Sequence, residues 1–185
     1  MSVTVSNAFP ELPEVPYQRT TVSMFDAIQY INSLQVSKNV KIAAYVIFRE
    51  ESGNGRDGVN NNYIGAQGDV AKWGLSIALK SHIVGTCVEK ENLRQSDGSQ
   101  KPRRFLCFDS YKASIDFLVE KLQARDIYVG GKTNSAYSKI DIKTPEDWVL
   151  AYWKEWEAGD IKAVPSKVEA NNLLSIYHQG ITLFT

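Results

Sequence analysis

The chain has 185 residues, and its 21 basic and 21 acidic side chains give a formal net charge of zero. Hydrophobic residues make up 43% of it and charged residues 23%, a composition that excludes a disordered or fibrous protein. A balanced charge does not favour a general nucleic-acid binder, because such proteins carry a basic surface. No stretch approaches the roughly 20 apolar residues that cross a bilayer, so we expect no transmembrane segment.

The first 20 residues predict an extended arm. They lack the basic start and the apolar block of a signal peptide. They contain Pro10, Pro13 and Pro16, which favour extended backbone. We therefore expect an N-terminal arm over residues 1–20 and a single domain over residues 21–185. Without a signal peptide, action outside the cytoplasm would require another route of export.

Two helices are predicted in the first third of the chain. Ser23 and Asp26 form a capping pair, and apolar residues then recur at helical spacing up to residue 34. The second helix runs from about Lys38 to Glu51, and its apolar positions indicate that most of it is buried. It ends in two consecutive glutamates.

A structured loop is predicted directly after this helix, over residues 52–69. It contains five glycines and three consecutive asparagines, residue types that accept backbone angles which others resist. A carboxylate at the end of a buried helix, beside such a loop, suits a general acid, because burial raises the pKa of a carboxyl group. Periodicity does not separate Glu50 from Glu51, and a solvated helix end is the competing interpretation.

Two strands are predicted next, over residues 82–91 and 103–108, with turn chemistry near Asp97 between them. A turn centred there places Glu91 opposite Arg103, a favourable cross-strand pair. The two strands therefore predict a small β-hairpin lobe in an otherwise helical chain.

The two cysteines, Cys87 and Cys107, face each other across this hairpin in the predicted register. A cross-strand disulfide or a metal pair is one interpretation. Two reduced thiols packed together are favoured, because two cysteines are too few for a disulfide framework and no export signal is present.

Three further helices complete the prediction. The first follows the hairpin over about 110–123. The second opens at Thr144, with a proline at the first helical position, and runs to about Glu157. The third opens with a capping box at Ser166 and ends near Tyr177. The sum is a mostly helical α+β domain with a small hairpin lobe.

Several motifs stand in a fixed order between residues 51 and 140. They are Glu51-Ser52-Gly53, Asn61-Asn62, Gly65, the segment from Phe108 to Ile115, and Ala136-Tyr137-Ser138-Lys139-Ile140. In this order the chain resembles the lysozyme-like superfamily, most closely the peptidoglycan β-N-acetylglucosaminidases of glycoside hydrolase family 73. The resemblance implies a lysozyme-like domain whose hairpin lobe flanks an active-site cleft. The segment from Ile64 to Gln67 is also similar to the Gly-Leu-Met-Gln motif of lytic transglycosylases.

The resemblance implies roles for particular side chains. Glu51 matches the general acid that protonates the leaving glycosidic oxygen, with Glu50 as its non-catalytic neighbour. A hydrolase usually needs a second carboxylate. The hairpin offers Glu89, which is slightly preferred, and Glu91. Tyr137 matches the active-site tyrosine of the family.

Five side chains are expected to contact the glycan or to shape its site. They are Asn62, Tyr63, Gln67, Trp148 and Tyr152. Tyr63 and Gln67 would line the cleft, and Asn62 would hold the loop backbone through side-chain hydrogen bonds. Aromatic residues at helical spacing more often belong to a core, and Trp153 and Trp156 are assigned there.

The expected function is cleavage of β-1,4 bonds in the N-acetylglucosamine/N-acetylmuramic acid strands of peptidoglycan. A lytic transglycosylase and a non-catalytic glycan-binding or structural module remain as alternatives. We expect no cofactor and no metal, because His82 and His178 lie far apart without ligand spacing. In the absence of a signal peptide, a phage endolysin, a virion component or a protein delivered by a secretion machine is expected.

Overall fold

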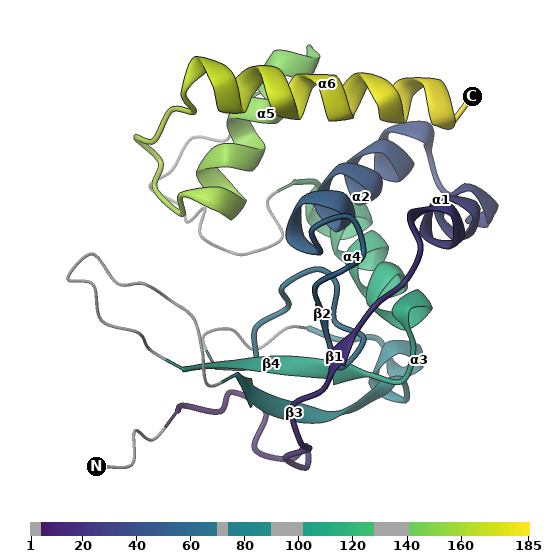
Figure 1. The fold of residues 1–185 in the computed structure, drawn as a ribbon, viewed down its shortest axis with the longest axis vertical. Helices are drawn as coiled ribbons and strands as arrows, with labels where there is room; N and C mark the ends of the chain where they lie inside the picture. The colour runs from purple at the N-terminus through teal and green to yellow at the C-terminus, as the bar shows by residue number, and fades with distance from the viewer. Residues whose placement is uncertain (1–4, 70–73, 90–101, 128–140) are drawn as a thin grey trace. The chain divides into compact units, whose positions relative to one another are not determined.

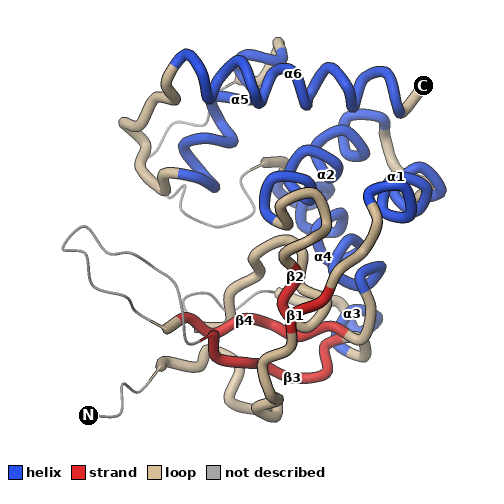
Figure 2. Tube along the Cα trace, in the orientation of Figure 1, coloured by secondary structure: helices blue, strands red, loops and turns tan. Residues whose placement is uncertain are grey.

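The computed structural model describes residues 5–69, 74–89, 102–127 and 141–185 (Figure 1). Within these ranges the chain forms α-helices and small antiparallel sheets, so the fold class is α+β, as the sequence predicts (Figure 2). The chain divides into two compact units. The first unit comprises residues 1–27 and 48–117, and the second unit comprises residues 28–47 and 118–185. The predicted boundary at residue 20 stays a prediction.

Each predicted helix is present, and a short helix that was not predicted precedes the hairpin. The helices are α1 (Met24–Ser33), α2 (Lys38–Glu51), α3 (Ile77–Lys80), α4 (Tyr111–Arg125), α5 (Pro145–Tyr152), the π-helix η1 (Trp153–Glu157) and α6 (Lys167–Leu183). The predicted capping residues Thr144 and Ser166 are confirmed, and both form capping boxes. The hydroxyls of Thr144 and Ser166 accept hydrogen bonds from backbone N–H groups three residues on, and the acidic side chains there bond back to the caps.

Helix α6 continues six residues beyond its predicted end at Tyr177. The reason is Gly180, which is buried inside the helix. A Cβ at this position would lie 3.1 Å from Cγ2 of Ile42 and 3.3 Å from Cδ1 of Tyr45, both on α2. The glycine therefore permits close helix packing within the second unit instead of ending the helix.

The main sheet of the first unit is the antiparallel hairpin of β3 (Ile83–Glu89) and β4 (Arg103–Phe108). Glu89 pairs with Arg103, and Cys87 pairs with Phe105. The predicted register, with Cys87 opposite Cys107, is wrong by two residues, because the pairing is centred one residue before Asp97. A shift of two residues keeps every side chain on its own face.

The two cysteines consequently remain neighbours on one face of this hairpin, in diagonal rather than opposite positions. Both are buried and neither forms a disulfide. The hydrogen bond from the neighbouring thiol and burial raise the pKa of Cys107. The same hydrogen bond lowers the pKa of Cys87. The two buried thiols pack against each other as small side chains of the hairpin.

Both edges of the hairpin are extended by irregular segments. On the β4 edge, Gln67 forms an antiparallel bridge with Phe105, and Gly68 N–H donates to the Arg104 carbonyl at 2.8 Å. On the β3 edge, Thr86 N–H donates to the Pro13 carbonyl at 2.9 Å. Backbone hydrogen bonds therefore hold the N-terminal segment and the glycine-rich loop against the two edges of the hairpin.

The predicted loop over 52–69 also contains a two-residue strand, β2 (Gly58–Val59), which pairs with β1 (Arg19–Thr20) (Figure 1). Beside it, the Asn60 amide donates to the Pro16 carbonyl at 2.9 Å, and its oxygen accepts from Gln18 N–H at 2.7 Å. Asn60 itself adopts a left-handed backbone with φ of 47°. Turn-forming residues thus anchor the loop to the N-terminal segment.

The second unit has an aromatic core. The Trp148 and Tyr152 rings stack with centroids 5.4 Å apart, and Tyr177 packs 5.2 Å from Trp148. Trp153 and Trp156, which were assigned to the core, are only half-buried. Trp156 uses its indole N–H to donate to the Ile127 carbonyl at 3.1 Å. The change from α5 to a π-helix after Tyr152 alters the helical periodicity on which that assignment rested.

No described helix combines the length and the apolar character that crossing a membrane requires.

Candidate functional site

Glu51 is the last residue of α2, and its position separates it from Glu50. Glu51 is half-buried, whereas Glu50 is exposed. A Cβ placed at Gly65 would lie 2.9 Å from Oε2 of Glu51, so this carboxylate rests against the backbone of the loop. Gly65 has a φ of +63°, which an L side chain rarely adopts. Glu51 is therefore the glutamate that faces the loop.

The chain leaves α2 through a run of left-handed residues. Gly53, Asn54 and Gly55 have φ values of 53°, 63° and 79°. The buried Ser52 hydroxyl bridges this turn, donating to the Phe48 carbonyl and accepting from Gly55 N–H at 2.8 Å. A closed polar turn of this kind fixes the position of the last helical residue, which is Glu51.

Asn62 holds the loop in the way that the sequence predicts. Its amide donates to the carbonyls of Ala66, at 2.8 Å, and Leu106, at 2.9 Å. Its oxygen accepts from the N–H groups of Ile64, at 3.3 Å, and Ala66, at 3.1 Å. The side chain is buried among these partners. Asn62 therefore shapes the loop and joins it to β4.

Tyr63 lies inside the first unit instead of lining a cleft. Its ring is 1% exposed and stacks on Phe48, with centroids 5.4 Å apart. A Cβ at Gly58 would lie 2.4 Å from the Tyr63 ring, so the ring fills the space beside that glycine. Burial raises the pKa of the Tyr63 hydroxyl. The structure gives this tyrosine a packing role between α2 and the loop.

The segment that follows Gly65 forms a single bridge with β4 and then bends. Gln67 is half-buried and bridges to Phe105, as described above. Two residues further on, Asp69 contacts Arg103 of β4. The sequence predicts residues 52–69 as a loop and does not indicate this contact.

Asp69 is the acidic residue that the sequence analysis did not assign to the site. Its side chain is 8% exposed, and Oδ2 accepts from Nε of Arg103 at 3.0 Å. Within the described parts of the chain, its other oxygen, Oδ1, is buried without a hydrogen-bond partner. Buried polar atoms are nearly always paired, so such an atom requires an explanation.

Glu89, the preferred second carboxylate of the sequence analysis, is half-buried near the end of β3. It pairs with Arg103 across the hairpin. Burial, the Glu89 charge and a hydrogen bond to Glu89 together raise the pKa of the Tyr17 hydroxyl. The Glu89 carboxylate is thus held by a phenol from the N-terminal segment.

Two further predicted catalytic residues, Glu91 and Tyr137, lie outside the described residues. Trp148 and Tyr152 belong to the second unit, where they are 4% and 0% exposed. Their ring faces are occupied by each other and by neighbouring aromatic rings. The structure thus gives these two residues the core role that the sequence analysis assigned to Trp153 and Trp156.

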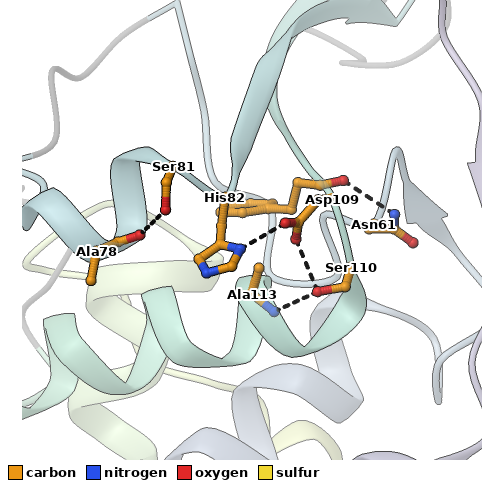
Figure 3. Close-up of polar contacts among 8 residues, drawn as sticks. Asn61, Ala78, Ser81, His82, Asp109, Ser110 and Ala113 are labelled. Carbon is orange, nitrogen blue, oxygen red and sulfur yellow. Dashed lines mark hydrogen bonds and ion pairs between the residues drawn. The ribbon is translucent and has the colours of Figure 1, made fainter.

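A polar cluster closes the other end of the hairpin (Figure 3). Nδ1 of His82 lies 2.6 Å from Oδ2 of Asp109, and Ser110 donates to the other oxygen of Asp109 at 3.0 Å. The hydrogen bond to Asp109 raises the pKa of His82. Burial acts to raise the pKa of Asp109, but hydrogen bonds from His82 and Ser110 hold it below its usual value.

The hydrogen bonds of this cluster have a structural role, because they join the end of the hairpin to the start of α4. The Ser110 hydroxyl bonds to the carboxylate rather than to the imidazole, and it also accepts from Ala113 N–H to cap α4. A nucleophilic serine requires the opposite order, with the histidine between serine and acid. Nearby, the Asn61 amide donates to the Phe108 carbonyl at 3.1 Å, which fastens the loop to β4 (Figure 3).

Among the described residues, no group of three or more histidine, cysteine, aspartate or glutamate side chains is arranged to hold a metal ion.

No protein-family model, curated protein or solved structure matches this chain.

Proposed function

We propose that this protein is a lysozyme-like glycosidase that cleaves β-1,4 bonds of peptidoglycan strands, with Glu51 as the general acid. One observation carries the proposal. The Glu51 carboxylate ends a largely buried helix and rests against Gly65, in a loop whose shape is fixed by Asn62. A general acid needs a defined position relative to the bond that breaks, and this arrangement supplies one.

The environment of Glu51 also suits proton donation. A half-buried carboxyl group at a fixed position can donate its proton to the leaving group of a bound substrate. In glycoside cleavage that proton passes to the leaving oxygen as an oxocarbenium-like transition state develops at the sugar. Glu50, one residue earlier, is exposed.

The substrate class is supported by the order of the motifs that resemble the peptidoglycan glucosaminidases. Glu51, the paired asparagines and Gly65 all lie at the same corner of the first unit. Tyr137 and Glu91 keep their proposed roles beside the glycan, as an auxiliary group and a candidate second acid. Delivery to the cell wall by a phage or by a secretion machine follows from the same proposal.

Lytic transglycosylation is the second candidate function. It is favoured by Gln67, which follows Gly65 in a segment similar to the Gly-Leu-Met-Gln motif and is held against β4. In that reaction a hydroxyl of the substrate, instead of water, attacks the anomeric carbon, so no second carboxylate is needed to activate water. The two reactions share Glu51 and differ in their products.

The test uses purified peptidoglycan and two matched variants. Glu51→Gln is expected to lower the cleavage rate by about 1,000-fold, because it removes the donated proton and preserves shape. Glu50→Gln changes the adjacent, exposed glutamate and is expected to keep the rate within about threefold. Circular dichroism and thermal melting would establish that both variants fold.

Mass analysis of the released fragments separates the candidates. New reducing ends indicate hydrolysis, and anhydro ends indicate transglycosylation. Full activity of Glu51→Gln would overturn the mechanism. Binding of the folded wild-type protein to peptidoglycan without any cleavage would leave only a glycan-binding or structural module.

A further inference from the structure

The second unit contains a cavity that the proposed glycosidase reaction does not use. Its volume is about 490 Å³, which lies within the roughly 300–1,000 Å³ of ligand pockets in proteins. The described residues that line it come from the start of α2, the end of α4, α5 with the segment before it, and α6. All of them belong to the second unit, so the cavity is formed within one compact unit.

Aliphatic side chains make up part of the wall of this cavity. They are Val40 and Ala43 of α2, Leu122 of α4 and Ile142 before α5. Ala43 and Leu122 are buried, and the other two are half-buried. A ligand whose hydrocarbon part covers these side chains removes apolar surface from water, which favours binding.

Two aromatic residues, Trp148 and Tyr177, complete the apolar wall. Their ring centroids lie 5.2 Å apart, and Tyr152 stacks on Trp148 at 5.4 Å. Because these neighbours cover it, the Trp148 side chain is only 4% exposed. The cavity therefore offers little aromatic surface on which a sugar ring could stack, and its apolar wall suits an aliphatic chain better.

Asp126 is the charged residue among the described residues that line the cavity. It directly follows α4 and has a left-handed backbone with φ of 57°. Its Oδ1 accepts from the N–H of Ile127 at 2.8 Å, and its Oδ2 forms no hydrogen bond or ion pair with another described residue. The side chain is exposed. One oxygen of a positioned carboxylate is therefore within reach of a ligand.

The surroundings of Asp126 favour a positively charged group. Burial and the charge of Asp126 together raise the pKa of the Tyr177 hydroxyl, so the carboxylate acts on the wall of the cavity. The carboxyl end of α4 also carries a partial negative charge. Arg125, in the last turn of α4, is exposed and is not among the lining residues. The described lining thus combines one negative charge with an apolar wall.

We propose that this cavity binds an alkylammonium group, with the nitrogen on the Asp126 carboxylate and the hydrocarbon chain against the apolar wall. The ammonium group donates to Oδ2 of Asp126 in a charge-assisted hydrogen bond. Asn39 and Gln123 are exposed lining residues whose amides can bind polar groups attached to the chain. Free aliphatic amines and the lysine side chains of peptides both carry such a group. The proposal is independent of the glycosidase function.

The test is an NMR titration of the isotope-labelled full chain with three probes of equal chain length. Pentylamine carries the ammonium group, pentanol lacks the charge, and pentanoate reverses it. Pentylamine is expected to bind with a dissociation constant on the order of 1 mM, because a ligand of this size makes few contacts. It should bind about fivefold more tightly than pentanol. Pentanoate should bind more weakly than either, and the shifts should centre on the amides of Val40, Gln123 and Asp126.

Matched variants test the carboxylate. Asp126→Asn is expected to weaken pentylamine binding about fivefold and to leave pentanol binding within about twofold, since it removes the charge and preserves shape. Asp160→Asn is the control. Asp160 is also exposed and its Oδ1 also accepts a backbone N–H, from Lys162 at 2.9 Å, but it does not line the cavity. It should keep pentylamine affinity within about twofold of wild type.

A third variant tests the apolar wall. Val40→Phe enlarges a half-buried wall residue and is expected to weaken pentylamine and pentanol alike, because it occupies the space of the hydrocarbon chain. Melting temperatures establish that each variant is folded. If Val40→Phe does not fold, the three probes and the two aspartate variants still decide the proposal.

The amide of Nα-acetyllysine distinguishes the two sources of the ligand. It carries the same ammonium group on a side chain between two amide bonds. Tighter binding than pentylamine supports the proposal and assigns the cavity to a lysine side chain within a peptide. Weaker binding of this compound, with pentylamine bound as expected, supports the proposal and assigns the cavity to a free amine.

Three outcomes would overturn the proposal. They are equal binding of pentylamine and pentanoate, an unchanged affinity for pentylamine in Asp126→Asn, and shifts that do not saturate or that lie outside the cavity. The titration contains no glycan, so its failure leaves the proposed glycosidase function standing. A protein that cleaves no peptidoglycan would likewise leave this binding site to be judged by the titration alone.

Discussion

The glycine-rich loop of the first unit and the aromatic cluster of the second unit reach fixed structures by opposite means. Residues 52–69 are polar and rich in glycine, yet buried side-chain hydrogen bonds from Ser52 and Asn62 hold their backbone. Trp148 and Tyr152 are fixed by stacking, with almost no exposed surface. The Glu51 carboxylate at the end of α2 rests against this loop, whereas the rings of the cluster enclose one another. The proposed chemistry therefore lies in the region that composition alone marks as irregular.

The largest expected effect tests the aromatic side of this comparison. Trp148→Ala removes a ring that packs on both Tyr152 and Tyr177, and it should lower the free energy of unfolding by about 4 kcal/mol. Urea denaturation measures this. Trp148→Phe, as the control, should cost much less and leave glycan affinity unchanged. A loss of glycan affinity in a stable Trp148→Phe protein would show that this ring contacts sugar after all.

The second-largest expected loss of stability concerns the buried hydrogen bonds of the glycine-rich loop. Asn62→Ala removes four hydrogen bonds and leaves buried backbone groups unpaired, so the free energy of unfolding should fall by about 3 kcal/mol. Asn171→Ala on the exposed surface of α6 is the control and should change it by less than about 0.5 kcal/mol. Equal denaturation midpoints for the two variants would contradict the assigned role of Asn62.

A smaller change in stability should separate folding from activity. Gly65→Ala places a methyl group against the Glu51 carboxylate at a φ of +63°, so we expect a loss of about 2 kcal/mol in stability. Glycan cleavage should fall about tenfold or more, since Glu51 must move. Gly74→Ala is the control, because nothing lies within 4 Å of its added Cβ. Unchanged cleavage by Gly65→Ala would show that the contact of Glu51 with this loop has no part in catalysis.

The smallest expected effect on stability concerns the ion pair of His82 and Asp109. The pKa of His82 is raised above 6.5, so its stabilising contribution is complete below that pH and is lost as the pH rises through the raised value. The pKa of Asp109 is lowered below 3.8, so its contribution is present above that pH and disappears under stronger acid. The melting-temperature difference between wild type and His82→Ala should thus be larger at pH 5.5 than at pH 8.5. A difference independent of pH would refute the ion pair.

Helix positions are predictable from this sequence because their signals are local. The bounds of α2 match the prediction at both ends, and the caps at Thr144 and Ser166 form as expected. Non-local packing explains the failures. Gly180 lies inside α6 because a larger side chain there would press against α2. The hairpin register differs from the prediction because the pairing is centred one residue before the predicted turn centre.

The candidate site was predictable in part. Glu51 stands out because a helix of clear periodicity ends there, and Asn62 because paired asparagines commonly bind backbone. Asp69 was missed because its importance depends on pairing with β4 and on the Arg103 contact, neither of which leaves a mark in the local sequence. Tyr63 and Trp148 were predicted to contact the glycan, but both are buried. The local sequence around an aromatic residue does not distinguish a sugar-binding ring from a core ring.

The central claim is that Glu51 donates a proton during hydrolysis of a glycan strand. Its most direct test is digestion of purified peptidoglycan in heavy-oxygen water, with mass analysis of the fragments from wild type and Glu51→Gln side by side. The account predicts wild-type fragments with one heavy oxygen at each new reducing end, and none above background from the variant. Unlabelled ends, or equal release by a folded Glu51→Gln protein, would contradict it.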